Sequence, residues 1–241
     1  MMNKVNICQL EILTAKNQQE LISFLLNDGQ IKSGKLIAIN AEKAVLSKEN
    51  PELFSLLSQA EYKYADGISI VCSIKKKYPQ YSSLERIAGA DLWLGLMQAS
   101  CEYQIPVFIL GGDAQVIEQT KQKLLDMKVN IVGSHNGYFS GAEEDSLIES
   151  IKCSGAKLVT VALGSPKQEL FMQKAQKHYP DALYMGVGGS YDVFVGKVKR
   201  APLVWQQLGL EWLYRVLHQP TRWRRQVRLV KYAYYHLTNQ L

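Results

Sequence analysis

The sequence lacks the short motifs that hold disulfides, zinc, metal-bound diphosphates or dinucleotides. It has no Cys-x-x-Cys pair and no Asp-x-Asp pair, its four histidines are scattered, and its four cysteines lie far apart at Cys8, Cys72, Cys101 and Cys153. Such spacing is typical of free thiols. The Gly111-Gly112 turn lacks the full G-x-G-x-x-G fingerprint, and we interpret it as allowing a helix to pack closely on a strand. We therefore expect no metal and no cofactor, which leaves arginines as the natural groups to bind an anion.

Long apolar runs are also missing. No 18 consecutive residues lack a charged or strongly polar side chain, and the first residues do not follow the basic-then-apolar order of a signal peptide. We therefore expect a cytoplasmic protein. Positive charge is concentrated late in the chain, because residues 197–241 carry nine basic residues and one acid, Glu211, a net charge of +8, whereas the first 196 residues carry −2.

One stretch combines a buried strand with the start of a helix. Residues 158–163 are an apolar, β-branched run that predicts a strand buried on both faces. Gly164 then makes a turn, Ser165 is the predicted N-cap, Pro166 the first helical residue, and Gln168 completes a capping box. Such a turn presents unpaired N–H groups at the carboxyl edge of a sheet, where α/β proteins bind anions.

The same alternation of strand and helix recurs along the chain. Further strands are predicted at 35–39, 62–65, 106–110, 129–133 and 183–187. Helices are predicted from Asn40 as a cap and at 18–26, 51–59, 68–77, 91–102, 114–127, 143–153 and 166 to about 178. This order predicts an α/β fold with a Rossmann-like, mostly parallel sheet and helices on both faces. We expect residues 1–202 to form this core and residues 203–241 to form a basic, amphipathic helical appendage.

Two predicted strands end next to groups that could act on a substrate. Asp66 follows the strand at 62–65 and could accept a proton from a hydroxyl nucleophile, although its position alone favours a helix cap. Gly186, Gly188, Gly189 and Asp192 follow the last strand. Small residues there would let a ring or a phosphate approach the backbone, although turn formation would also explain them.

Six sequence blocks stand in one order along the chain: Y-A-D-G (64–67), R-I-A-G-A-D-L (86–92), N-G-Y-F (136–139), G-S-P-K-Q-E (164–169), M-G-V-G-G-S-Y-D-V-F (185–194) and K-R-A-P…G-L-E-W-L-Y-R…P-x-R-x-x-R (199–225). Together they resemble the WecG/TagA/CpsF glycosyltransferases, over about residues 35–228. Six blocks in register are far more specific than any one of them. Within the family, N-A-E-K (40–43), K-Y-A-D-G-I-S (63–69) and M-G-V-G-G (185–189) are most similar to members that transfer N-acetyl-D-mannosaminuronic acid from its UDP derivative.

The resemblance implies a metal-independent, inverting transfer from a UDP-sugar donor to undecaprenyl-diphosphate-linked N-acetylglucosamine at the cytoplasmic membrane face. It implies that Asp66 is the catalytic base and that Asn40 and Gln168 lie near the reacting sugars. The residues it implies for substrate binding are Arg86, Gly89, Tyr138, Gly164, Gly186, Gly188, Gly189, Asp192, Arg200, Arg215, Arg222 and Arg225. One departure is that Ala38-Ile39 precede Asn40 where teichoic-acid members tend to have Thr-Pro, so a role of that threonine cannot be carried over.

Other interpretations stay open. The arginines of residues 203–241 are interleaved with aromatic residues, as in proteins that bind single-stranded nucleic acid, but Leu and Val at helical spacing favour an anionic membrane surface, so we expect no nucleic acid. A non-catalytic sensor of lipid-linked sugars is the second alternative. Lys43 is a candidate for binding the carboxylate of a uronic acid donor, although a solvated lysine near a helix start is the simpler interpretation. The sequence leaves a homo-oligomer open.

Overall fold

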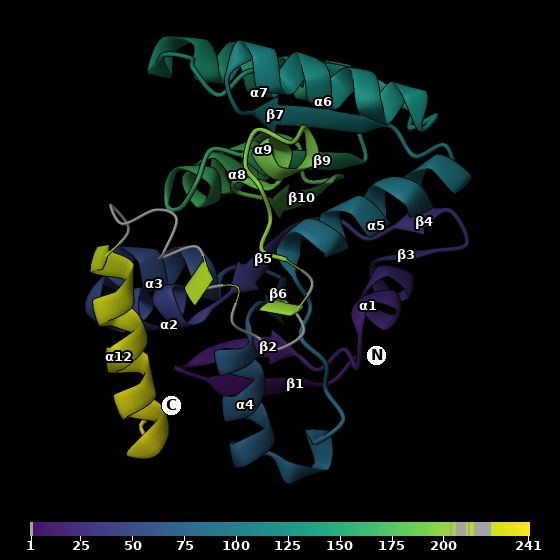
Figure 1. Ribbon diagram of the computed structural model, residues 1–241. Helices are drawn as coiled ribbons and strands as arrows, with labels where there is room; N and C mark the ends of the chain where they lie inside the picture. Colours follow the sequence, from purple (N-terminus) through teal and green to yellow (C-terminus); the bar gives the residue numbers. More distant parts are fainter. Residues whose placement is uncertain (1, 203, 206–210, 212, 215–222) are drawn as a thin grey trace.

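The computed structural model describes residues 2–202, 204–205, 211, 213–214 and 223–241, the last range without the side chains of 223–226 (Figure 1). Six strands form one sheet in the order β6-β5-β10-β9-β7-β8, and every neighbouring pair is parallel. Their bounds are β5 Gly34–Ile39, β6 Tyr62–Ala65, β7 Val107–Gly111, β8 Ile131–His135, β9 Leu158–Ala162 and β10 Leu183–Gly186. The predicted α/β fold is confirmed.

Helices cover both faces of the sheet because successive side chains of each strand point to opposite sides. On β7, Phe108 and Leu110 join one apolar cluster, whereas Val107 and Ile109 join the other. The first cluster contains α2 (Ala41–Glu49), α3 (Pro51–Ser58), α4 (Ile68–Lys77), α7 (Gly141–Cys153) and α8 (Lys167–His178). The second contains α1 (Gln18–Leu25), α5 (Gly89–Glu102), α6 (Ala114–Asp126) and α9 (Ser190–Phe194).

Two short hairpins were not predicted. β1 (Lys4–Ile7) pairs antiparallel with β2 (Leu10–Leu13), and β3 (Leu26–Asn27) pairs antiparallel with β4 (Gln30–Ile31). The first hairpin packs Ile7 and Leu10 into the same cluster as α4. A short 3₁₀ turn, η1 (Pro79–Tyr81), lies in the predicted loop after α4. The other boundaries agree within two residues, and β8 starts two residues late because the Val129 N–H still bonds to Leu124 at the end of α6.

The start of α8 differs from the prediction. The helix begins at Lys167 with Pro166 at the N-cap position, and no side chain caps it. The predicted capping box from Ser165 to Gln168 is therefore wrong. The physical reason is tertiary, since the Gln168 side chain binds Glu169 and the backbone of Gly188 instead of the helix end.

The last helix is confirmed and packs on the core. α12 (Trp223–Leu237) lies beside α2 (Figure 1) and places Tyr232, only 3% exposed, in the cluster that includes α2 and α4. The Tyr232 hydroxyl donates to Ser73 Oγ at 2.7 Å, and Arg228 pairs with Glu42 at 2.9 Å. Lys231 pairs with Glu49. The division of the chain at residue 202 stays a prediction, and most of the first half of the appendage predicted at 203–241, up to residue 222, lies outside the described residues. None of the described helices has the length and apolarity needed to cross a membrane.

Candidate active site

The carboxyl ends of four neighbouring strands bring the predicted residues together. Asn40 follows β5, Asp66 follows β6, Gly164 lies two residues after β9, and Gly188 lies two residues after β10. Because the strands are parallel, these positions share one edge of the sheet. After β7 the chain enters α6 on one face, whereas after the adjacent β9 it enters α8 on the other face. Such a topological switch point is where α/β proteins bind ligands.

Asp66 is held at this edge by its backbone. Its N–H donates to the Ile39 carbonyl at 2.9 Å, which extends the pairing of β6 with β5 and places Asp66 beside Asn40. The helix-cap interpretation is wrong, because α4 has Gly67 at its N-cap and no side-chain cap. Burial, and then the charge of Asp66, raises the pKa of Tyr64 well above its ordinary value. Asp66 therefore lies close to a buried tyrosine, in a half-buried position.

Gly89 leaves room for these groups. A Cβ placed on Gly89 would lie 3.0 Å from the Tyr64 hydroxyl and 3.8 Å from Asp66 Oδ2. The first turn of α5 thus borders the candidate base directly, and the assignment of Gly89 to substrate binding stays a prediction. The Tyr64 hydroxyl itself is buried with no hydrogen-bond partner among the described residues.

Asn40 acts as the predicted cap. Its side-chain oxygen accepts from the Lys43 N–H at 2.9 Å and starts α2. Lys43 is buried and forms an ion pair with Glu169, with Nζ 2.8 Å from Oε1. The interpretation as a solvated lysine is therefore wrong, and an ammonium already bound by Glu169 argues against reading a donor carboxylate.

The turn after β10 is organised around Gln168. This side chain is 4% exposed, its Nε2 donates to Glu169 Oε1 at 3.0 Å, and its Oε1 accepts from the Gly188 N–H at 3.1 Å. Gly186 faces the same amide so closely that a Cβ would lie 2.7 Å from Nε2. Gly189 and Asp192 follow, and a Cβ on Gly189 would lie 3.9 Å from Asp192 Oδ2. Gln168 and the glycine turn thus form one unit.

Aromatic packing fixes the short helix that carries Asp192. The Trp93 ring of α5 contacts Phe194 and Tyr191, with centroids 5.1 Å and 5.3 Å away. The Tyr191 hydroxyl lies 2.6 Å from Thr160 Oγ1 on β9. A buried tyrosine was not predicted here, although its place in the Ser190–Phe194 segment directly after the glycines was a usable signal.

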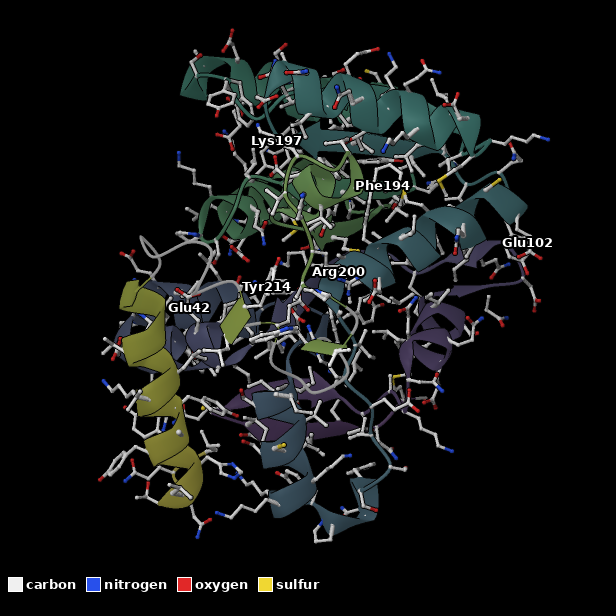
Figure 2. The ribbon with its side chains drawn as sticks, viewed as in Figure 1. Glu42, Glu102, Phe194, Lys197, Arg200 and Tyr214 are labelled. Carbon is white, nitrogen blue, oxygen red and sulfur yellow. The ribbon has the colours of Figure 1, made fainter. Side chains whose placement is uncertain are left out.

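Three basic side chains near the edge, Arg86, Arg200 and Lys197, are each held by a carboxylate. Arg86 binds Glu211 at 2.7 Å, and Arg200 binds Asp91 through both of its terminal nitrogens, one of them at 2.7 Å. Figure 2 shows Arg200 on the segment that descends from α9 toward Tyr214, with Lys197 nearer to α9. Lys197 pairs with Asp113 and lies 3.8 Å from Asp192. The guanidinium groups of Arg86 and Arg200 are thus held in fixed orientations by these acids.

Not every predicted residue can be placed in this cluster. Tyr138 is 80% exposed in the loop after β8, and its neighbour Gly137 donates to the Gly112 carbonyl at 2.8 Å, which sets that loop beside the end of β7. Arg215 and Arg222 lie outside the described residues, as does the side chain of Arg225.

Glycine at position 111 is required by strand packing, since a Cβ would lie 2.4 Å from the Ala162 carbonyl oxygen. Close approach to β9, rather than to a helix alone, therefore explains that residue.

Comparison with known families decides the class of protein. The model of the glycosyl transferase WecG/TagA/CpsF family matches residues 5–241, nearly the whole chain. The chain belongs to this family. As a WecG/TagA/CpsF glycosyltransferase it uses a sugar donor and an acceptor.

Membership in the WecG/TagA/CpsF family gives the clustered side chains a chemical setting. Glycosyl transfer requires a group to accept the proton of the acceptor hydroxyl, and Asp66 is a carboxylate at the sheet edge. In the part of the chain that the structure describes, no three His, Cys, Asp or Glu side chains gather as metal ligands would.

A pocket between β8 and α7, lined by His135, Glu143 and Ser150, lies at the opposite edge of the sheet from β6.

Three acids that organise the site were missed. Glu169, Asp91 and Glu211 neutralise Lys43, Arg200 and Arg86 respectively. Their only sequence signal was position, since Glu169 and Asp91 fall inside two of the family blocks and Glu211 is the one acid of the basic segment. None of them could be paired with a partner from sequence, because each pair joins residues more than 100 positions apart.

Proposed function

We propose that this protein transfers N-acetyl-D-mannosaminuronic acid from UDP-N-acetyl-D-mannosaminuronic acid to undecaprenyl-diphosphate-linked N-acetylglucosamine, with inversion and without a metal. This is the lipid I to lipid II step of enterobacterial common antigen synthesis. The observation that carries the proposal is the placement of Asp66 beside Asn40 at the carboxyl edge. Hydrogen bonds to Asp91 raise the pKa of the Arg200 guanidinium, and Asp66 is close enough for its carboxylate to add to that effect. The choice of donor is supported by the similarity of the blocks at 40–43, 63–69 and 185–189.

The reaction is a displacement at the anomeric carbon. The acceptor hydroxyl oxygen forms a bond to that carbon, the bond to the UDP oxygen breaks with its electron pair, and Asp66 takes the hydroxyl proton. Attack from the side opposite to UDP inverts the configuration. Negative charge grows on the departing diphosphate, and arginines are well suited to bind it because they present several fixed donors.

The arginines come from two parts of the chain. Arg86 and Arg200 are oriented by Glu211 and Asp91 in the described part. We assign Arg215, Arg222 and Arg225 to the same diphosphate when the segment after residue 203 folds over the sheet edge. On this proposal the nucleotide lies against the turn from Gly186 to Asp192, near Gly164.

Replacing Asp66 by Asn tests the base directly. General-base catalysis contributes about 10²- to 10⁴-fold, so Asp66→Asn should lower turnover by about that factor without unfolding the protein. The measurement is release of UDP from the donor in the presence of lipid-linked acceptor. Asp28→Asn is a matched control, because Asp28 lies in the β3–β4 turn bonded to Asn27 and away from the sheet edge. A rate for Asp66→Asn within a few-fold of wild type would remove Asp66 from the mechanism.

The donor is tested by competition among nucleotide sugars. UDP-N-acetyl-D-mannosaminuronic acid should give product on the lipid acceptor faster than UDP-N-acetylmannosamine or another UDP-hexose. Faster reaction of one of those sugars would make the protein a transferase of the same family with a different donor. Binding of the acceptor without any UDP release from any donor would instead indicate a non-catalytic sensor of lipid-linked sugars.

We also propose that α12 contacts the cytoplasmic face of the inner membrane. Val227, Val230, Tyr234 and Leu237 are exposed and follow spacings of three and four residues, so they form one outward face of the helix, which we term the outer face of α12. The opposite side is docked through Tyr232. An exposed apolar face with flanking basic residues is typical of helices that lie in a membrane interface.

The charge available for anionic lipid is smaller than the five cations between Arg222 and Lys231 suggest. Arg228 and Lys231 are paired with Glu42 and Glu49 of α2. Of the other three, Arg222 and Arg225 are assigned to the diphosphate, which leaves Arg224 to contribute about 1 kcal/mol near an anionic surface, before screening by salt. Membrane binding therefore depends on the outer face of α12 as well as on charge. Tight, salt-dependent binding of an oligonucleotide in place of vesicles would contradict this assignment.

A further inference from the structure

We infer that Glu169, held in place by Lys43, is a positioning residue that sets the shape of the turn after β10 by orienting the amide of Gln168. The inference rests on the proposed function in one respect, namely that this turn binds the UDP part of the donor. Neither Glu169 nor Lys43 is assigned to the chemical step. Their effect on the substrate passes through Gln168 and Gly188.

The pair links two helices across the end of β10. Lys43 lies in the first turn of α2, which follows β5, and Glu169 lies in the first turn of α8, which follows β9. β10 runs between these two strands. The 2.8 Å contact between Lys43 Nζ and Glu169 Oε1 is almost fully buried, with side-chain exposures of 10% and 1%. The two helix starts are thereby tied together directly above the turn.

The carboxylate determines which way the Gln168 amide faces. Glu169 Oε1 accepts from Gln168 Nε2 at 3.0 Å, and an ionised carboxylate can only accept. The amide nitrogen must therefore face Glu169, which leaves the amide oxygen to accept from the Gly188 N–H at 3.1 Å. The flipped amide would set an NH₂ group against the Gly188 N–H and an oxygen against the carboxylate, and both contacts are repulsive.

Glu169 is ionised in this setting. Burial raises the pKa of its carboxyl group, but the Lys43 ammonium and hydrogen bonds from Lys43, Gln168 and Ser165 outweigh that effect, so its pKa lies below the ordinary value. The direction matters because a neutral carboxylic acid could donate as well as accept. The ammonium thus keeps the carboxylate in the one state that specifies the amide orientation.

The turn depends on that orientation because of its own geometry. Gly188 has φ +52°, in the left-handed region, and its N–H is the group that Gln168 holds. Gly186 has no space for a side chain against the same amide. A misplaced Gln168 amide would therefore move the backbone from 186 to 189, and with it the first turn of α9 that carries Asp192.

A buried ion pair by itself is weak evidence for a stabilising role. Replacing such a pair by apolar groups of similar volume is often neutral or stabilising, whereas removing one partner leaves an unpaired charge. The informative variant is therefore Lys43→Met with Glu169→Leu, which removes both charges together. It should fold, and the Gln168 amide should lose the acceptor that holds its nitrogen in place.

Two measurements on the full chain follow for this double variant. In titrations with UDP, its affinity should fall by about five- to tenfold, the factor expected when one hydrogen-bonded positioning contact is lost. In amide hydrogen exchange, the Gly188 N–H should exchange at least about tenfold faster, because its acceptor is no longer held. Gln173→Leu is the matched control, since Gln173 lies on the same helix, is half-buried, and donates to Gln59 at 2.8 Å through its side chain, away from Gly188.

A cycle with Gln168→Met separates positioning from a general structural effect. If Glu169 acts through Gln168, the triple variant should bind UDP no more weakly than Gln168→Met alone. Additive losses would overturn the inference, and so would unchanged Gly188 exchange in the double variant. A wild-type protein that does not bind UDP at all would overturn the proposed function instead, and the exchange measurement would still decide whether Glu169 and Lys43 set the turn.

Discussion

The outer face of α12 gives the sharpest test of membrane attachment. We consider a variant with Val230→Ser and Leu237→Ser. These side chains are 72% and 74% exposed, so the fold buries little of either, and the substitutions should leave the stability of the protein almost unchanged. A membrane interface, by contrast, would bury the apolar area that both residues present.

The expected loss of membrane-binding free energy follows from that apolar area. Full burial of a valine or leucine side chain contributes about 1.5–3 kcal/mol. With about three quarters of each side chain available, the two substitutions should remove roughly 2–4 kcal/mol of binding free energy. This corresponds to a loss of roughly thirtyfold to several hundredfold in vesicle partitioning, because about 1.4 kcal/mol is a factor of ten.

Sedimentation with vesicles of phosphatidylcholine and phosphatidylglycerol provides the assay, with circular dichroism to verify folding. Leu125→Ser is the matched control, since Leu125 is an exposed leucine, 42% accessible, on α6 rather than α12. The control should partition as wild type does. Equal partitioning of wild type, control and double variant would refute the idea that the outer face of α12 contacts the bilayer, and attachment would then have to arise from charge or from residues outside the described part.

Two further predictions concern the turn after β10. Gly186→Ala should destabilise the protein by about 1–3 kcal/mol through overpacking and should weaken UDP binding, because the new Cβ would lie 2.7 Å from Gln168 Nε2. Gly141→Ala is the control, since nothing lies within 4 Å of its Cβ, and it should be neutral or slightly stabilising in the same thermal denaturation. Equal effects of the two substitutions would contradict the steric argument. The pKa of Glu169 is lower in the folded state, so its pairing with Lys43 stabilises the fold above the ordinary glutamate pKa of about 4.3 and is lost as the pH falls through the depressed value. The melting temperature of wild type should therefore fall more steeply below about pH 5 than that of Lys43→Met/Glu169→Leu, and parallel curves would show that the pair does not titrate with unfolding.

Local signals were sufficient for the order and the ends of most elements. The strand at 158–162 could be read from its β-branched run, and the start of α2 from Asn40, because both depend on residues within four positions of each other. The same holds for α12, whose apolar residues at spacings of three and four predicted a helix. The predicted ends of two strands placed Asp66 and Gly188 directly after them, which is where the structure has them, whereas the order of strands in the sheet could not be predicted.

Contacts between distant parts of the chain were decided only by tertiary structure. Ser165 and Gln168 have the spacing of a capping box, yet the Gln168 side chain binds the Gly188 backbone 20 positions away because the packed sheet brings a better-placed donor to it. In the sequence Lys43 has the features of a surface lysine, but in the structure it is buried in an ion pair with Glu169, 126 positions later. The two partners of an ion pair stand at no regular spacing in the sequence, since Coulomb attraction depends on their distance in space and not along the chain. The amino-acid order therefore determined which groups stand at the carboxyl edge, and the packing of α2 and α8 on the sheet decided which of them bind one another and which remain to face a substrate.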